Sequence, residues 1–239
     1  MHPASMLAAG VAVAASAWIQ GSVGFGYALV SAPLLALVAP GLVPGPVMLS
    51  SLVLSLASGL REHPHIDRRG VSLALVGRVP GVALGAAALA RLPQETMDVV
   101  FGAVVLAAVA LSVSGLRLPL TTRTLLGTGF LSGVMGTMTS IGGPPIALVY
   151  QHAEGPELRA TLNTYFALGS AMSIAALALA GRFGHRELAS GLLMLPATAV
   201  GFALSGASRR YLDQGRTRSA VLAVATVSAL AVVVKTLLA

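Results

Sequence analysis

Eight apolar stretches follow one another along the chain, separated by short polar loops that carry most of the arginines. Their typical length is about 18 to 22 residues, which is what a helix needs to cross the hydrocarbon core of a bilayer. The pattern therefore predicts an all-α polytopic membrane protein. The predicted elements cover residues 4–39, 43–60, 70–90, 95–114, 121–151, 158–181, 187–206 and 217–238.

Glycine and proline interrupt the first and the fifth of these stretches. The interruptions read Gln20-Gly21-Ser22-Val23-Gly24-Phe25-Gly26 and Thr139-Ser140-Ile141-Gly142-Gly143-Pro144-Pro145. As one continuous helix the first stretch would be about 54 Å long, which exceeds a hydrocarbon core of about 30 Å, so it must fold back or kink near residues 20–26. Non-helical backbone at membrane depth is tolerated only where protein buries it or where it lines a wet cavity. Two such breaks in corresponding positions point to the binding site of a transporter.

The two halves of the chain resemble each other. Ser22-Val23-Gly24 aligns with Ser140-Ile141-Gly142 at an offset of 118 (140 minus 22), and Pro80 aligns with Pro196 at an offset of 116 (196 minus 80), as does Gly85 with Gly201. This similarity predicts two repeats, residues 1–119 and 120–239, which together form one membrane domain. Each repeat would contain one broken, re-entrant-like element and three transmembrane helices.

The loop charges favour inverted repeats. If each broken element returns to its starting side, ten cationic residues share one side of the membrane and four lie on the other; if each crosses once, the division is eight against six. The stronger asymmetry fits the excess of positive charge in cytoplasmic loops. We therefore expect two inverted repeats with both termini on the periplasmic or extracellular side.

Composition supports the membrane prediction and narrows the function. Hydrophobic residues make up 56% of the chain and charged residues 10%, whereas a soluble domain has about a quarter charged residues. The net charge of +7 comes almost entirely from loop arginines, which the topology explains without a nucleic-acid partner. There is no cysteine, and no phosphate-binding loop, zinc-protease motif or nucleophile elbow, so we expect neither an enzyme nor a cofactor. The pair His63 and His65 has no third ligand nearby, so no metal site is expected.

The breaks are the strongest candidates for a binding site. A helix that begins after Gly24 or after Gly143 would direct free N–H groups and a positive dipole end toward the membrane interior. Pro144 suits the first turn, where a missing N–H costs nothing. Two such ends that face each other would form an anion site. The hydroxyl groups that would assist are those of Ser22, Thr139 and Ser140. The alternative is that the glycines only allow helices to pack closely.

Arg78 is the only charged residue well inside an uninterrupted apolar stretch. A buried arginine usually marks a substrate path or an ion pair, and no acidic residue lies at matching depth, so an anionic ligand is its natural partner. The alternative is that its long side chain reaches the membrane surface. Gln20, Asn163 and Tyr165 are further candidates to face the pore, or they only form hydrogen bonds between neighbouring helices.

Three segments together resemble a known family. The segment QGSVGFGYALVSAP at residues 20–33, the run from Arg78 to Gly81 with Gly85, and the break from Ser140 to Pro145 are similar to the TauE/SafE family of sulfite and organosulfonate exporters. The resemblance covers nearly the whole chain. It implies a permease of the bacterial inner membrane that moves sulfur-containing anions outward. The positions that match the family's motifs are Gly21, Gly24, Gly26, Arg78, Gly142, Gly143, Pro144 and Asn163.

The residues and the resemblance together predict a secondary transporter that exports sulfite, sulfoacetate or related organosulfonates by alternating access. An anion channel, or a permease for another anion such as a carboxylate, is the alternative. The expected partners are the small anion and membrane lipid. The sequence does not decide between a monomer and a homodimer. Export driven by the membrane potential is favoured over proton coupling, because no carboxylate is expected inside the membrane. The predicted substrate-binding residues are Gln20, Gly21, Ser22, Gly24, Gly26, Arg78, Thr139, Ser140, Gly142, Gly143, Pro144, Asn163 and Tyr165.

Overall fold

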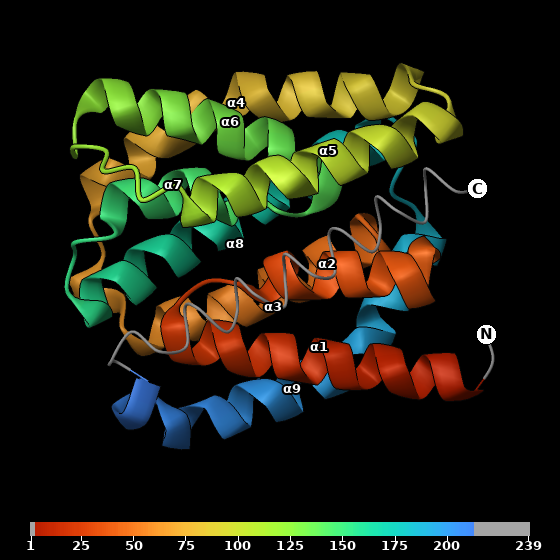
Figure 1. The fold of residues 1–239 in the computed structure, drawn as a ribbon, viewed down its shortest axis with the longest axis horizontal. Helices are drawn as coiled ribbons and strands as arrows, with labels where there is room; N and C mark the ends of the chain where they lie inside the picture. The colour runs from red at the N-terminus through yellow and green to blue at the C-terminus, as the bar shows by residue number, and fades with distance from the viewer. Residues whose placement is uncertain (1–2, 213–239) are drawn as a thin grey trace.

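Helices account for all the regular structure in residues 3–212, the part of the chain that the computed structural model describes. The long helices lie side by side, with their axes roughly along the horizontal of Figure 1. The prediction of an all-helical fold is therefore confirmed. The elements are α1 Pro3–Val23, α2 Tyr27–Val38, η1 Pro40–Leu42, α3 Gly45–Arg61, η2 His63–His65, α4 Arg68–Arg91, α5 Gln94–Val113, α6 Thr122–Thr139, α7 Gly143–Tyr150, α8 Gly155–Leu179 and α9 His185–Leu212.

Both of the elements predicted to be broken are broken. Residues 4–39 form α1 and α2, and residues 121–151 form α6 and α7. With 12 residues α2 is about 18 Å long, and α7 has only 8 residues, so neither is long enough to cross a bilayer by itself. The element predicted at 217–238 lies outside the described residues.

The first break is built from two glycines. α1 ends at Val23, Gly24 and Gly26 have φ angles of 99° and 114°, and α2 starts at Tyr27. Glycine adopts this left-handed conformation readily because it has no Cβ. The helix was expected to begin directly after Gly24, but Gly26 is its N-cap, so it begins two residues later.

The second break has the same design at an offset of 116. Val23 and Thr139 end their helices, and Tyr27 and Gly143 begin the next ones (139 minus 23, and 143 minus 27). Ser140 stands where the first half has Gly24, and it has a left-handed φ of 69°, which is uncommon for a residue other than glycine. The structural offset thus equals that between Pro80 and Pro196, and it replaces the offset of 118 read from the two short motifs.

The most extensive helix contacts join one half of the chain to the other. The most extensive contacts join α4 to α6 and α1 to α9, and α3 packs along α8. At the offset of 116, α1 corresponds to α6 and α4 to α9, so these two contacts are counterparts. In Figure 1, α1 and α6 run in opposite directions, and so do α4 and α9.

Glycines let the backbones of these helix pairs approach closely. A Cβ added at Gly129 of α6 would lie 2.1 Å from the carbonyl oxygen of Ala74 in α4. In the other pair, a Cβ at Gly201 would lie 2.0 Å from the carbonyl oxygen of Ala14. Small residues allow this approach where helices pack in membranes.

Two helices extend beyond their predicted limits. α9 continues to Leu212 instead of ending at 206, so Arg209 and Arg210 lie on the helix and not in a loop. Arginine is a good helix former; its charge marks the edge of an apolar stretch but does not end a helix. Likewise α8 begins at Gly155 and not at 158, which places Glu157 in the first turn of the helix.

Four helices within the described residues are long and apolar enough to cross a membrane, at residues 5–23, 68–91, 155–179 and 185–207. Large apolar side chains on two of them are exposed, including Leu179, Leu193 and Leu204. Surfaces of this kind are suited to lipid rather than to water. The protein is a multi-pass membrane protein.

Candidate functional site

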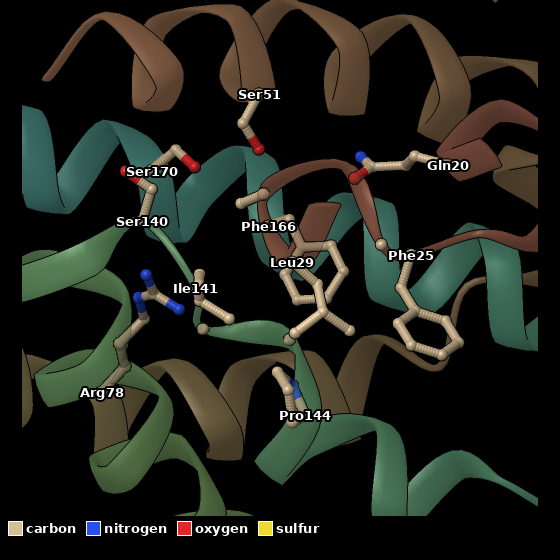
Figure 2. Close-up of a pocket in the computed structure, with 14 residues that line it drawn as sticks. Gln20, Phe25, Leu29, Ser51, Arg78, Ser140, Ile141, Pro144, Phe166 and Ser170 are labelled. Carbon is tan, nitrogen blue, oxygen red and sulfur yellow. The ribbon is translucent and has the colours of Figure 1, made fainter. Parts of the chain in front are cut away.

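The two breaks meet at one cavity. Its volume is about 30 Å³, enough for about two water molecules. Figure 2 shows the residues around it, which come from both breaks and from α3, α4 and α8. The lining residues are Gln20, Phe25, Gly26, Ala28, Leu29, Ser51, Arg78, Ser140, Ile141, Gly142, Gly143, Pro144, Phe166 and Ser170.

Two helix N-termini open onto this cavity. Gly26 is the N-cap of α2 and Gly142 is the N-cap of α7, and neither has a side chain that could cap its helix. Because the first N–H groups of a helix have no acceptor within it, such ends attract anions. The N-termini of α2 and α7 therefore lie at the same cavity.

The side chain of Arg78 extends from α4 toward the second break, and Arg78 is only 4% exposed to solvent. Its Nη1 donates to Ser132 Oγ at 3.0 Å and to Tyr165 Oη at 3.2 Å, and its Nη2 donates to Ser173 Oγ at 3.4 Å. Its Nε has no hydrogen-bond partner. The side chain is thus held inside the protein and does not reach the membrane surface.

Three glycines enclose the guanidinium. A Cβ added at Gly169 of α8 would lie 2.6 Å from both Cζ and Nε of Arg78. At Gly136 of α6 it would lie 2.9 Å from Nη2, and at Gly142 it would lie 3.3 Å from Nη1. Side chains at these positions would compete with the guanidinium for space. Its position therefore depends on the absence of a side chain at all three glycines.

Arg78 has no anionic partner among the described residues. The ion pair recorded there joins Arg159 to Glu62, with Nε 3.0 Å from each carboxylate oxygen, and it lies where α3 ends and α8 begins. The contacts of Arg78 are hydroxyl groups and the face of the Tyr165 ring, whose centroid is 5.2 Å from Cζ. A buried cation that has only neutral neighbours favours binding of an anion.

Side-chain amides hold the first break. Gln20 donates to Ser55 Oγ at 2.9 Å and to Asn163 Oδ1 at 3.1 Å, and its Oε1 accepts from the N–H of Tyr27 at 3.2 Å. Asn163 in turn donates to the carbonyl oxygen of Gly24 at 3.1 Å. The polar backbone that the break exposes is therefore satisfied largely within the protein, including one of the N–H groups at the start of α2.

The two breaks thus differ in chemistry although they share a backbone design. At the offset of 116, Gln20 corresponds to Gly136, and the missing side chain there leaves room for Arg78. Arg78 corresponds to Met194, which is buried in an apolar cluster with Tyr27. The first break is held by the amides of Gln20 and of Asn163 from α8, whereas the second break lies next to the cation of Arg78 from α4.

Seven of the thirteen predicted site residues line the cavity, and the other six do not. The seven are Gln20, Gly26, Arg78, Ser140, Gly142, Gly143 and Pro144. Of the six, Asn163 and Tyr165 support Gln20 and Arg78, and Gly24 packs against Arg159.

The remaining three predicted residues have local structural contacts. Gly21 packs against Ser205 and Phe202 of α9, so it serves close helix packing. The hydroxyl of Ser22 donates to the carbonyl oxygen of Trp18, and that of Thr139 to the carbonyl oxygen of Met135. Hydroxyls that bond back to the preceding turn are common in helices, and here they direct both groups to their own backbone.

Several residues of the cavity were not predicted. Phe25, Leu29, Ile141 and Phe166 supply apolar wall, and their sequence pattern cannot be told from that of other core residues. Ser170 is four residues after Phe166 and Ser173 is three residues further on. This helical spacing puts all three on one face of α8, and it is the one signal that would have found them.

No three His, Cys, Asp or Glu side chains that could hold a metal ion cluster among the described residues. His63 Nδ1 lies 3.2 Å from the carbonyl oxygen of Leu60 at an exposed turn. The site therefore consists of a buried guanidinium, neutral hydroxyl and amide groups, and two helix N-termini.

Comparison with known proteins agrees with this architecture. The sequence pattern of the family described as Sulfite exporter TauE/SafE matches residues 8–232, which is nearly the whole chain. The chain belongs to this family. A curated relative from Cupriavidus necator (strain H16), described as a probable sulfite/organosulfonate exporter TauE, is 29% identical over 147 residues. That alignment covers 57% of this chain and 56% of the relative, about half the length of each. No solved structure matches the chain.

Proposed function

We propose that this TauE/SafE chain is a secondary transporter that exports small sulfur-containing anions: sulfite, sulfoacetate or related organosulfonates. The observation that carries the proposal is Arg78, a buried cation without an anionic partner among the described residues, located where two helix N-termini meet. Family membership and the description of the Cupriavidus relative point to the same class of substrate.

The substrate would bind through its sulfonate or sulfite oxygens. Arg78 would contact one oxygen through Nε, the guanidinium nitrogen without a partner. The N–H of Gly143, at the first position of α7, would donate to a second oxygen, assisted by the hydroxyls of Ser140 and Ser170 at the same cavity. Hydrogen bonds to a charged group are shorter and roughly twice as strong as neutral ones. Ser132, Tyr165 and Ser173 would hold the guanidinium and not the substrate.

Alternating access would follow from two inverted repeats, residues 1–119 and 120–239. The contacts α1–α9 and α4–α6 between the two halves, and the opposite directions of corresponding helices, support this arrangement. A cavity of about 30 Å³ is too small for a tetrahedral oxyanion, so the two breaks would have to separate during loading. The left-handed residues Gly24, Gly26 and Ser140 are the natural hinges.

The direction of transport would be outward across the bacterial inner membrane, with both termini periplasmic. A membrane potential that is negative inside drives an anion out by about 2.3 kcal/mol per charge per 100 mV. No carboxylate lies among the described residues around the cavity, so export would be driven by the potential and would need no coupled proton.

The experiment is efflux of sulfite and of sulfoacetate from proteoliposomes under a clamped potential. Arg78→Gln should abolish efflux, and Arg123→Gln, which removes an exposed arginine from α6, should leave it unchanged. Efflux that persists in Arg78→Gln would contradict the role of the arginine. The absence of efflux for every sulfur anion tested would contradict the function itself.

Two further readouts separate the alternatives. Loss of efflux on collapsing the pH gradient alone, with the potential held constant, would show proton coupling. Single-channel currents far above the turnover of a carrier would show an anion channel instead.

A further inference from the structure

The cavity between the two breaks contains a single full charge. Among the residues that the structure describes, Arg78 is the only ionic side chain that lines it, and the other polar lining groups there are the neutral amide of Gln20 and serine hydroxyls. Arg159 is also buried, and it is already paired with Glu62. The site therefore carries a net charge of plus one before a ligand enters.

We infer that this charge makes the site selective for anions with one negative charge over anions of the same shape with two. The inference rests on the proposed function, in which Arg78 contacts the substrate. A monoanion and the guanidinium together form a neutral pair. A dianion leaves one negative charge uncompensated in a cavity that has room for only about two water molecules, and moving an unpaired charge out of bulk water is strongly unfavourable.

The helix N-termini do not supply the missing charge. Each helix end has only a partial positive charge, and its effect falls off within the first turn. One of the donors at the start of α2 is already occupied, because the N–H of Tyr27 bonds to Gln20 Oε1. The hydroxyls of Ser51 and Ser170 can donate hydrogen bonds but bring no net charge.

This selectivity specifies the form of the substrate. An organosulfonate whose only charged group is the sulfonate has one negative charge and would be accepted. Sulfoacetate, which also has a carboxylate and therefore two negative charges, would bind more weakly than such a singly charged organosulfonate. Of the two ionised forms of sulfite, the singly charged bisulfite would be the form that binds. Sulfate, which has two charges and nearly the same shape as a small sulfonate, would be rejected.

The test is direct binding of methanesulfonate and of sulfate to the full-length protein, measured by titration calorimetry at equal ionic strength. The two anions differ mainly by a methyl group in place of a charged oxygen. We expect methanesulfonate to bind at least tenfold more tightly. A smaller preference, or a preference for sulfate, would overturn the inference while leaving an anion transporter in place. Binding of neither anion would refute the proposed function, and the inference with it.

A second cation in the cavity should reverse the selection. Ser170→Lys adds one charge to the lining, and Ser51→Lys does so from α3; each should shift the affinity ratio toward sulfate by at least tenfold. Ser72→Lys, on an exposed position of α4, is the matched control and should leave the ratio unchanged. Thermal unfolding identifies which of the two cavity variants is folded, and an unchanged ratio in a folded variant would overturn the charge argument.

Discussion

Gly169 offers the most direct test of how the guanidinium of Arg78 is positioned. In Gly169→Ala the new Cβ would lie 2.6 Å from Cζ and Nε, whereas ordinary contact begins at 3.4 Å. The guanidinium must therefore move by about 0.8 Å (3.4 minus 2.6). It has little room to do so, because the backbones of Gly136 and Gly142 lie close to its two terminal nitrogens.

A displacement of this size is enough to break a hydrogen bond. The bond from Nη1 to Ser132 is 3.0 Å long and would be stretched beyond the usual range. The same displacement moves Nε away from the anion that it is proposed to contact. A hydrogen bond to a charged group is worth about 1.5–3 kcal/mol, so loss of that contact should lower anion affinity by roughly 10- to 150-fold. Stability should change less, because overpacking costs about 1–3 kcal/mol while replacing glycine by alanine in a helix returns about 0.5–1 kcal/mol.

The assay is titration calorimetry with methanesulfonate, accompanied by thermal unfolding. Gly127→Ala is the control, since no atom lies within 4 Å of the added Cβ, and it should bind like the wild type. If folded Gly169→Ala binds methanesulfonate with wild-type affinity, the argument that the absence of side chains at the three glycines positions the guanidinium is wrong.

Three further predictions concern stability, measured by unfolding of the purified protein in detergent. Asn163→Leu leaves buried polar groups of the first break without partners and should lower the free energy of unfolding by about 1–3 kcal/mol for each group. An unchanged unfolding midpoint would show that water replaces the amide. Gly129→Ala should destabilise by about 1–3 kcal/mol, because the backbones of α4 and α6 must separate, whereas Gly127→Ala should not; equal midpoints would contradict the close approach. Glu62→Gln should lower the free energy of unfolding by about 1–3 kcal/mol. This is less than the loss expected for a fully buried ion pair, because the side chains of Glu62 and Arg159 are 14% and 10% exposed. Exchanging the charges at Glu62 and Arg159 should recover part of that loss, and no recovery would mean that other contacts of the two residues dominate.

Much of the fold could be predicted from the sequence because the relevant signals are local. Membrane helices need long apolar runs, and glycine and proline end helices through their own backbone chemistry. Both breaks were therefore placed correctly, within the ranges 20–26 and 139–145. The boundaries were less accurate where charged residues continue a helix, as at Glu157 and Arg209, since charge affects membrane position more than helix formation.

The sequence by itself determined that the chain is helical and membrane-spanning, that two helices are interrupted, and that one arginine lies within an apolar stretch. Only the tertiary structure decided what these features do together. The hydroxyls that bind Arg78 are 54 to 95 residues away from it in the chain, and Gln20 meets Asn163 across 143 residues. Contacts of such separation leave no local pattern, because they depend on which helix faces pack against each other. The same packing places two side-chain amides at the first break and the guanidinium of Arg78 at the second. The two glycine motifs are similar in sequence and therefore could not reveal this difference.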